Sequence, residues 1–305
     1  MSLTQSRTAC LQFDEAIVKF YKGVRRPSPK DLKCIDSLHF AKHGVHGMLG
    51  SLDCCHSVWK SCPKAWQGNF QGQKGKPTIV MEAVIDYNLW FWHVSYGHAG
   101  TMNDLNVLEV SPLVHQFVDG SFNQAEIESD CVPFCIGNES FSNFYLMVDG
   151  IYPQYSRFVK TISEPVTRNE KKFASWQESS RKDVERGFGV FQKIWEWNAR
   201  PIQLHSLVEI SKRGACCVAL HNMIVSDRIM DGKVYETYDP AKGIEKDEFT
   251  IDEIEQPEDL EEFHNGIPPS LLSLGRDDNF PHQTWSSLVN KEEHQRLMKS
   301  LINRF

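Results

Sequence analysis

Three acidic residues stand at positions from which a folded chain could bring their carboxylates together. Asp53 follows the apolar run MLGSL, and Asp149 follows the apolar run FYLMV. If these runs form neighbouring parallel strands, both carboxylates emerge at the same edge of the sheet. Glu185 flanks an apolar stripe of helical period, so its side chain can point toward the sheet rather than into bulk water.

Such a trio predicts a metal site. Three carboxylates within a few ångströms repel one another and shift one another's pKa values, and divalent cations relieve that repulsion. Mg²⁺ and Mn²⁺ prefer hard oxygen ligands. Two such ions about 3.5–4 Å apart can activate a water or hydroxyl and stabilise the leaving oxygen in a phosphodiester displacement. For Asp149 alone, a solvated Asp-Gly turn is the alternative.

A central sheet must hold these residues. Strands are expected where β-branched and aromatic residues cluster, over residues 48–53, 79–86, 89–96, 144–148 and 158–162, with Tyr87-Asn88 turning a hairpin. Apolar residues at helical spacing predict helices over residues 13–21, 103–108, 184–195, 204–228 and 291–305. The segment RRPSPKDL reads as a Pro-rich connector. This order predicts a mixed α/β domain with helices flanking the sheet.

Composition places the chain among ordinary globular proteins. It has 305 residues, of which 41% are hydrophobic and 24% charged, and no apolar run approaches the roughly 20 residues of a membrane helix. Its first residues lack the basic-then-apolar pattern of a secretory signal. Nine cysteines, some of them adjacent, do not look like a disulfide framework in a chain of this size, which favours a reducing intracellular compartment.

The net charge of −7 is distributed unevenly along the chain. Residues 239–262 hold eleven acids and two lysines, whereas residues 157–213 hold twelve Arg or Lys and seven acids. The acidic segment is expected to be flexible, either as a solubilising extension or as a competitor for the basic face. Within the basic segment, Arg181, Lys182 and Arg186 surround Glu185 and suit phosphate contacts, although a solvated charged face has the same composition.

Several blocks of sequence resemble those of one family. The stretch from GMLGSLDCCH to TMNDLNVL, followed by YLMVDGIYP, VERGFGVFQ and VALHNMIV, is similar to the ordered blocks of Harbinger-type (PIF/Harbinger, plant transposon protein) DDE transposases. The resemblance spans about residues 13–228. It implies a ribonuclease H-like fold and a catalytic, metal-binding triad that by motif match falls on Asp53, Asp149 and Glu185.

The resemblance also implies activity, cofactors and partners. It implies a divalent-metal-dependent nuclease that uses two Mg²⁺ or Mn²⁺ ions for hydrolysis and transesterification of DNA in the nucleus. A separate Myb-like DNA-binding protein and self-association into a homo-oligomer are further implied partners. No membrane partner is expected.

Two neighbouring residues have two open interpretations each. Asp104, in TMNDLNVL, also falls in a family block, and it either hydrogen-bonds at a helix start capped by Asn103 or binds metal directly. His56, three residues after Asp53, either contacts a phosphate or a metal ligand, or is a structural histidine.

These observations predict three segments. Residues 1–45 would be a helical remnant of a longer N-terminal region, residues 46–230 the ribonuclease H-like catalytic domain, and residues 231–305 an acidic, partly disordered extension with a terminal helix. The alternative function is a catalytically silent, domesticated transposase that serves as a chromatin or protein-interaction scaffold. The intact triad favours the enzyme, and the short segment before Asp53 favours the scaffold.

Overall fold

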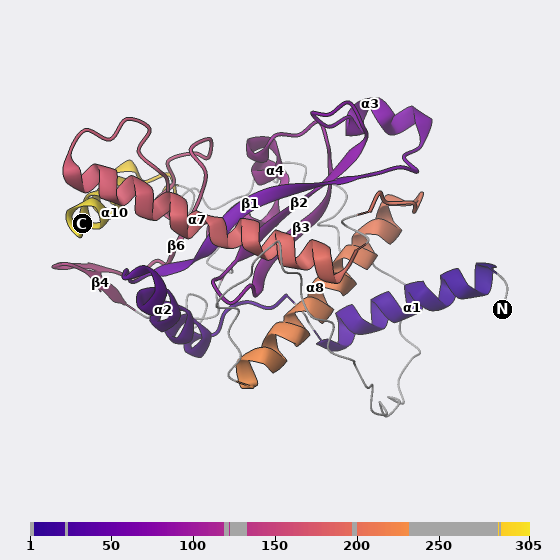
Figure 1. Cartoon of the computed structure of the whole chain (residues 1–305), viewed down its shortest axis with the longest axis horizontal. Coiled ribbons are helices and arrows are strands. Elements are labelled where there is room, and N and C mark those ends of the chain that lie inside the picture. The colour runs from indigo at the N-terminus through magenta and orange to yellow at the C-terminus, as the bar shows by residue number, and fades with distance from the viewer. Residues whose placement is uncertain are drawn as a thin grey trace.

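A five-stranded mixed sheet forms the centre of the molecule in the computed structural model (Figure 1). The structure describes residues 3–21, 24–118, 122, 133–196, 200–231, 286 and 288–305. The strand order is β3-β2-β1-β6-β7, with bounds Met48–Val58 for β1, Thr78–Ile85 for β2, Phe91–Ala99 for β3, Tyr145–Met147 for β6 and Phe158–Val159 for β7. Strands β1, β2 and β3 pair antiparallel, whereas β6 is parallel to both β1 and β7.

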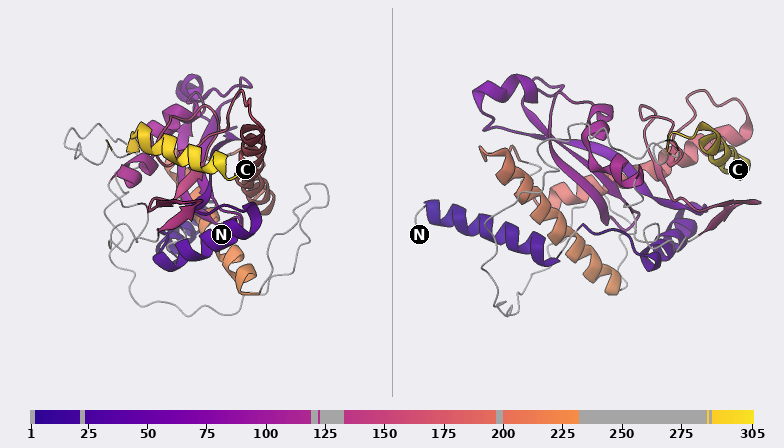
Figure 2. Two further views of the ribbon diagram at one scale, coloured as in Figure 1. Left: turned by 90° about the vertical axis from the view of Figure 1, so that its left-hand side faces the viewer. Right: turned by 180° about the vertical axis from the view of Figure 1, so that it is seen from behind.

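Helices cover both faces of this sheet (Figures 1 and 2). The helices are α1 (Leu3–Tyr21), α2 (Pro29–His43), α3 (Gln67–Phe70), α4 (Asp104–Val110), α5 (Pro112–Val118), α7 (Arg168–Ile194), α8 (Leu207–Met230) and α10 (Lys291–Asn303). A short 3-10 turn, Lys64–Trp66, precedes α3, and a separate hairpin pairs β4 (Phe134–Ile136) with β5 (Glu139–Phe141). The predicted strands and helices are present, but α1, α7 and β1 are longer than predicted, and β6 and β7 are shorter. None of the described helices has the length and apolar character of a membrane span.

Alternation along the strands sorts the core into two layers. On β2, Ile79, Met81, Ala83 and Ile85 pack with α7 and α8, whereas Val84 points to the opposite face with α2, α4, α5 and α10. The predicted helical stripe of α7 is confirmed, because its apolar residues are buried in the first of these layers. Helix α7 therefore lies against the sheet face formed by the odd-numbered residues of β2.

A glycine allows α7 to approach the sheet closely. A Cβ atom on Gly187 would lie 2.7 Å from Ile85 Cδ1 and 2.9 Å from Ile85 Cγ2, inside van der Waals contact. We expect Gly187→Val to lower the free energy of unfolding by about 1–3 kcal/mol, because overpacking would push α7 away from β2. Urea denaturation checks this. A control, Gly68→Ala, adds a Cβ with no atom within 4 Å and should leave stability unchanged or slightly raised. Equal stability of Gly187→Val and the wild type would contradict the close approach.

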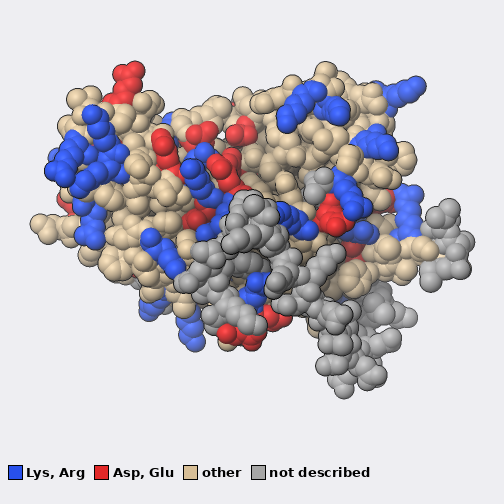
Figure 3. All heavy atoms as spheres, in the orientation of Figure 1, with Lys and Arg blue, Asp and Glu red and all other residues tan. Residues whose placement is uncertain are grey.

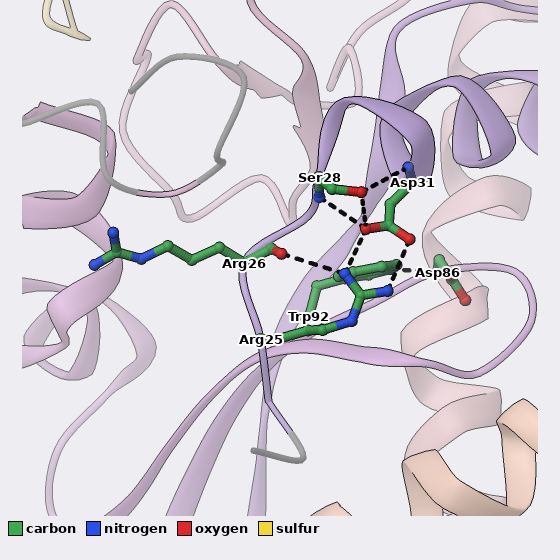
Figure 4. A network of polar contacts seen from close by, with 6 residues as sticks. All are labelled: Arg25, Arg26, Ser28, Asp31, Asp86 and Trp92. Carbon is green, nitrogen blue, oxygen red and sulfur yellow. Dashed lines mark hydrogen bonds and ion pairs between the residues drawn. The ribbon is translucent and has the colours of Figure 1, made fainter. Parts of the chain in front are cut away.

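The connector predicted over RRPSPKDL is wrong, since helix α2 begins inside it. Ser28 caps the helix in a capping box with Asp31, and Pro29 occupies the first turn, where its missing N–H costs nothing. Arg25 forms two hydrogen bonds with the same Asp31 carboxylate and stacks 5.5 Å from the Trp92 ring (Figure 4). The Ser-Pro sequence is thus a helix start tied to β3, rather than a linker.

Below this network lies a buried acid, Asp86, that accepts hydrogen bonds from the Trp92 indole (2.9 Å) and the Trp90 N–H (3.0 Å). Burial raises the pKa of Asp86 to about 7, while these hydrogen bonds pull it partly back. A raised pKa in the folded state means that the folded protein binds the proton more tightly, so the stabilisation is complete below about pH 4.

We therefore expect the unfolding free energy of the wild type to fall between pH 4 and pH 8, relative to Asp86→Asn, by up to about 4 kcal/mol. Urea denaturation of both proteins across this range gives the difference curve. A flat difference curve would show that Asp86 titrates normally.

The other sequence predictions meet the structure as follows. The eight cysteines within the described ranges are all free, as expected for them. The terminal helix is present as α10, which packs through Leu297 and Leu301 into the same core layer as β6 and β7. The acidic segment 239–262 lies outside the described residues. The termini lie at opposite ends of the long axis (Figure 1).

Candidate active site

Two of the predicted carboxylates belong to the parallel strand pair of β1 and β6, Asp53 within β1 and Asp149 just after β6. The register aligns Ser51 of β1 with Met147 of β6, so Asp53 and Asp149 each stand two residues further along. Adjacent strands lie about 4.8 Å apart. Strand β6 ends at Met147, whereas β1 continues to Val58. Asp53 therefore lies on β1 at the level where the neighbouring strand stops and Asp149 begins a turn into solvent.

The turn after β6 has the features of the solvated Asp-Gly turn that the sequence offered as the alternative for Asp149. Asp149 is exposed, and its Oδ1 accepts a hydrogen bond of 2.7 Å from the Gly150 N–H. Gly150 does not adopt a positive φ, and a Cβ there would meet no atom within 4 Å. The turn therefore does not require glycine at this position.

The third carboxylate reaches the sheet from α7. The Ser51 hydroxyl donates to the Ser180 carbonyl (3.2 Å), which places this turn of α7 directly over β1. The next residue, Arg181, places its Nη1 3.2 Å from Asp53 Oδ2 and its Nη2 3.0 Å from Oε1 of Glu185, one turn further along α7. One guanidinium therefore stands between two predicted members of the trio, and the structure brings Asp53 and Glu185 to the same cation.

The electrostatics of Asp53 reflect its surroundings. Burial raises the pKa of Asp53 to about 6, and the nearby carboxylates of Asp104 and Glu185 raise it further. The N–H of Cys54 and the guanidinium of Arg181 act in the opposite direction. A partly buried acid next to other acids holds a negative charge at a cost, which a cation offsets.

The three predicted ligands are of the chemical type that a hard divalent cation prefers. The three predicted ligands are all carboxylates, and a positively charged group already lies against two of them. Within the described parts of the chain, no three His, Cys, Asp or Glu side chains are grouped closely enough to hold a metal ion. Arg181 lies between Asp53 and Glu185 and contacts both carboxylates.

The two auxiliary residues lie on the other side of β1. Successive side chains of a strand point to opposite faces, so Cys54 and His56 point away from Asp53. Asp104 approaches Cys54 from α4, and burial raises the pKa of Asp104. The side chain of Asn103 caps α4 as predicted, accepting from the Asn106 N–H (2.9 Å).

His56 makes a structural contact. Its Nδ1 lies 3.0 Å from Thr78 Oγ1 on β2, and burial lowers its pKa. The structure therefore gives His56 a structural contact, whereas the Asp104 carboxylate, which approaches from the Cys54 side of β1, lies close enough to Asp53 to raise the pKa of Asp53.

The basic residues around Glu185 divide into two kinds. The Arg186 guanidinium donates to the Tyr87 carbonyl, stacks 4.3 Å from the Tyr87 ring and lies 3.5 Å from Asp183 Oδ1, with its side chain 19% exposed. Arg186 thus ties α7 to the turn between β2 and β3. Lys182 is exposed and lines a hollow beside Glu185. Of the three predicted phosphate contacts, only Lys182 points into open space.

A basic groove runs along α7 up to the carboxylates, and we call it the α7 groove. It consists of two hollows that share His43 and Ser179. The first holds cations without an acid, and the second contains Glu185. The cationic residues that line the two hollows are Lys42, Arg168, Lys171, Lys172, Lys182, Arg186 and Lys193. Figure 3 shows blue side chains gathered where α7 begins, with red and blue side chains interleaved further along.

Sequence reasoning missed part of this groove. His43 Nε2 lies 2.9 Å from Asp183 Oδ2, and its Nδ1 lies 3.1 Å from Ser180 Oγ, so His43 joins α2 to α7 at the centre of the groove. The surplus of positive charge over residues 157–213 was a signal for the α7 residues. Nothing near Lys42 and His43 in the sequence indicated that they would lie beside α7.

Comparison with known proteins gives one result. A family model described as plant transposon protein matches residues 21–231, which include β1, β6, α7 and the whole α7 groove except its last residue, Phe305. No curated protein matches the chain, and no solved structure matches it.

Proposed function

This chain belongs to the plant transposon protein family of Harbinger-type elements, and from that premise we propose that it is a metal-dependent DNA endonuclease and strand transferase. Family membership indicates a transposase-related function. The finer proposal is that Asp53, Asp149 and Glu185 form the catalytic triad. The observation that carries it is the single cation shared by Asp53 and Glu185, next to a register that sets Asp149 beside Asp53.

The strand order supports a ribonuclease H-like fold. In chain order, β1, β2 and β3 form an antiparallel meander. The next two strands of this sheet, β6 and β7, add in parallel on the other side of β1. The proposed acids then stand on β1, the first strand of the sheet, directly after β6, its fourth strand in chain order, and on α7, the helix that follows the sheet. This is the distribution that the family resemblance implies.

In the proposed mechanism, the three carboxylates would hold Mg²⁺ or Mn²⁺. When bound, two such ions supply an activated water or 3′ hydroxyl and stabilise the leaving oxygen. The β1–β2 ladder fixes the position of Asp53, and helix α7 fixes Glu185 against β1. Asp53 must be ionised to act as a ligand, and its pKa is raised to about 6 without metal, so metal affinity should weaken as the pH falls below that value.

The α7 groove is the proposed path of the DNA backbone. Its cationic side chains extend from Arg168 to the site at Glu185, a separation of 17 residues that corresponds to about 25 Å of helix. Cationic side chains spread over this length can contact several phosphates of a DNA backbone. Positive charge at this spacing contacts phosphates without reading sequence. We propose that a separate Myb-like protein supplies sequence recognition, in the nucleus.

The scaffold remains a second candidate because of one observation. Arg181 already neutralises Asp53 and Glu185, which would allow a silent protein to keep its acids without a metal. Cleavage of supercoiled plasmid in Mn²⁺ separates the two candidates. The enzyme converts supercoiled DNA to the nicked form and loses this activity in EDTA, whereas the scaffold leaves the plasmid intact at every metal concentration.

A further inference from the structure

Arg181 lies where a metal ligand set would need an ion, and its geometry is unusual for a surface ion pair. Its two terminal nitrogens contact different carboxylates, at 3.2 Å on β1 and 3.0 Å on α7. The side chains of Arg181 and Asp53 are only 22% and 18% exposed, so water screens this pair less than it screens a surface pair. The contact with Asp53 thus joins the sheet to α7, whereas the contact with Glu185 lies within α7.

We propose that Arg181 is the resident counter-cation of the metal-free site, and that a divalent ion binds Asp53 and Glu185 only as the guanidinium leaves them. This inference rests on the proposed function, because it assumes that the carboxylates bind metal. The reason is electrostatic. A guanidinium and a divalent ion against the same oxygens repel each other, because both are positively charged and little water separates them. A compact divalent ion also attracts two carboxylates more strongly than one diffuse positive charge does.

The structure offers the displaced side chain a new partner. Arg181 is not among the residues that line the two hollows of the α7 groove, but its neighbours on α7 are, since Ser180 lines the first hollow and Lys182 the second. Its long, flexible stem allows the guanidinium to move into that groove without any movement of the helix. A planar guanidinium binds phosphate through paired hydrogen bonds. Arg181 would therefore hold the acids before metal binds and the DNA backbone afterwards.

This role makes Arg181 a positioning residue with two opposing effects. Without metal, it stabilises the fold by neutralising Asp53, whose ionised form is otherwise costly. With metal, it opposes binding, because its contacts with the acids must first be broken. A purely structural arginine would show the first effect without the second.

The test is Mn²⁺ binding by the full chain, measured by titration calorimetry, together with melting temperatures in EDTA and in Mn²⁺. We expect Arg181→Gln to melt at a lower temperature than the wild type in EDTA, and to bind Mn²⁺ about tenfold more tightly. Its melting temperature should rise more on adding Mn²⁺ than that of the wild type. Arg181→Lys, which keeps the charge but cannot span both acids as a fork, should give intermediate values.

A matched control is Arg213→Gln, which breaks a separate ion pair between Arg213 Nε of α8 and Asp14 Oδ2 of α1 (2.6 Å). It should lower the melting temperature in EDTA and leave the affinity for Mn²⁺ unchanged. This control separates a general loss of stability from an effect on the site.

The outcomes distinguish this inference from the proposed function. Equal or weaker Mn²⁺ binding by Arg181→Gln, with binding by the wild type intact, would overturn the counter-cation role and leave the metal site standing. If neither wild type, Arg181→Gln nor Arg181→Lys bound Mn²⁺, the metal-dependent function would itself fail. If Arg181→Gln did not fold, tighter binding by Arg181→Lys than by the wild type would support the inference, and unchanged binding would overturn it.

Discussion

Asp149→Asn is expected to reduce metal-dependent cleavage of DNA by about a thousandfold or more. Asparagine keeps the size and shape of the side chain but removes the charge, and a neutral amide is a much poorer ligand for Mg²⁺ or Mn²⁺ than a carboxylate. Asp149 is exposed, and within the described residues its side chain hydrogen-bonds to the following N–H, so the substitution should hardly change stability. We expect the same loss of activity for Glu185→Gln.

The measurement is nicking of supercoiled plasmid in Mn²⁺, with unfolding curves run in parallel. Glu178→Gln is a matched control, because Glu178 is an exposed acid on the same helix, seven residues before Glu185. This control should cleave at the wild-type rate. Equal cleavage by the wild type, Asp149→Asn and Glu185→Gln would assign the activity to a contaminating nuclease and remove the support for the triad.

Reversing two charges at the start of the α7 groove is expected to weaken DNA binding by about 10- to 100-fold at moderate salt. The double variant Arg168→Glu, Lys171→Glu replaces two groove cations in the first turns of α7. Acidic residues are favourable near a helix N-terminus, so α7 itself should not be weakened. Any loss of affinity therefore reports on the groove.

Fluorescence anisotropy with a labelled duplex at several salt concentrations checks this prediction. The slope of log affinity against log salt should become shallower by about 2, which corresponds to two lost phosphate contacts. The control is Lys74→Glu, Lys76→Glu, two exposed lysines before β2 that lie outside the groove. If both double variants lost affinity equally, DNA would bind by net charge rather than along α7.

The elements of the site could be predicted because their signals are local. The apolar run before Asp53 forms the buried first half of β1, the run before Asp149 contains the buried strand β6, and the period of α7 specifies which face it buries. The parallel register then follows from the fold class. What local signals could not supply was the partner of each charged side chain. Arg181 and Arg186 are five residues apart on one helix, yet the first binds two site acids and the second packs on Tyr87.

The error over RRPSPKDL had a different cause. Proline was read as a breaker, although Ser28 before it and Asp31 after it form the reciprocal hydrogen bonds of a helix start. The hairpin β4–β5 was missed because its strands have only three residues each, too few for an alternating pattern to emerge. Lys42 and His43 lie in the groove because of the placement of helix α2, which the sequence analysis did not predict.

The packing of α10 has a consequence for copies of the gene that lose their final codons. A premature stop ahead of Leu288 would leave every proposed ligand encoded, since the last of them is Glu185. It would nonetheless strip Leu288, Leu297 and Leu301 from the core layer that also buries β6, the strand preceding Asp149. Such a shortened product would expose apolar surface that chaperones and proteases recognise. An open reading frame through the three acids is therefore a poor guide to whether a genomic copy encodes a functional protein.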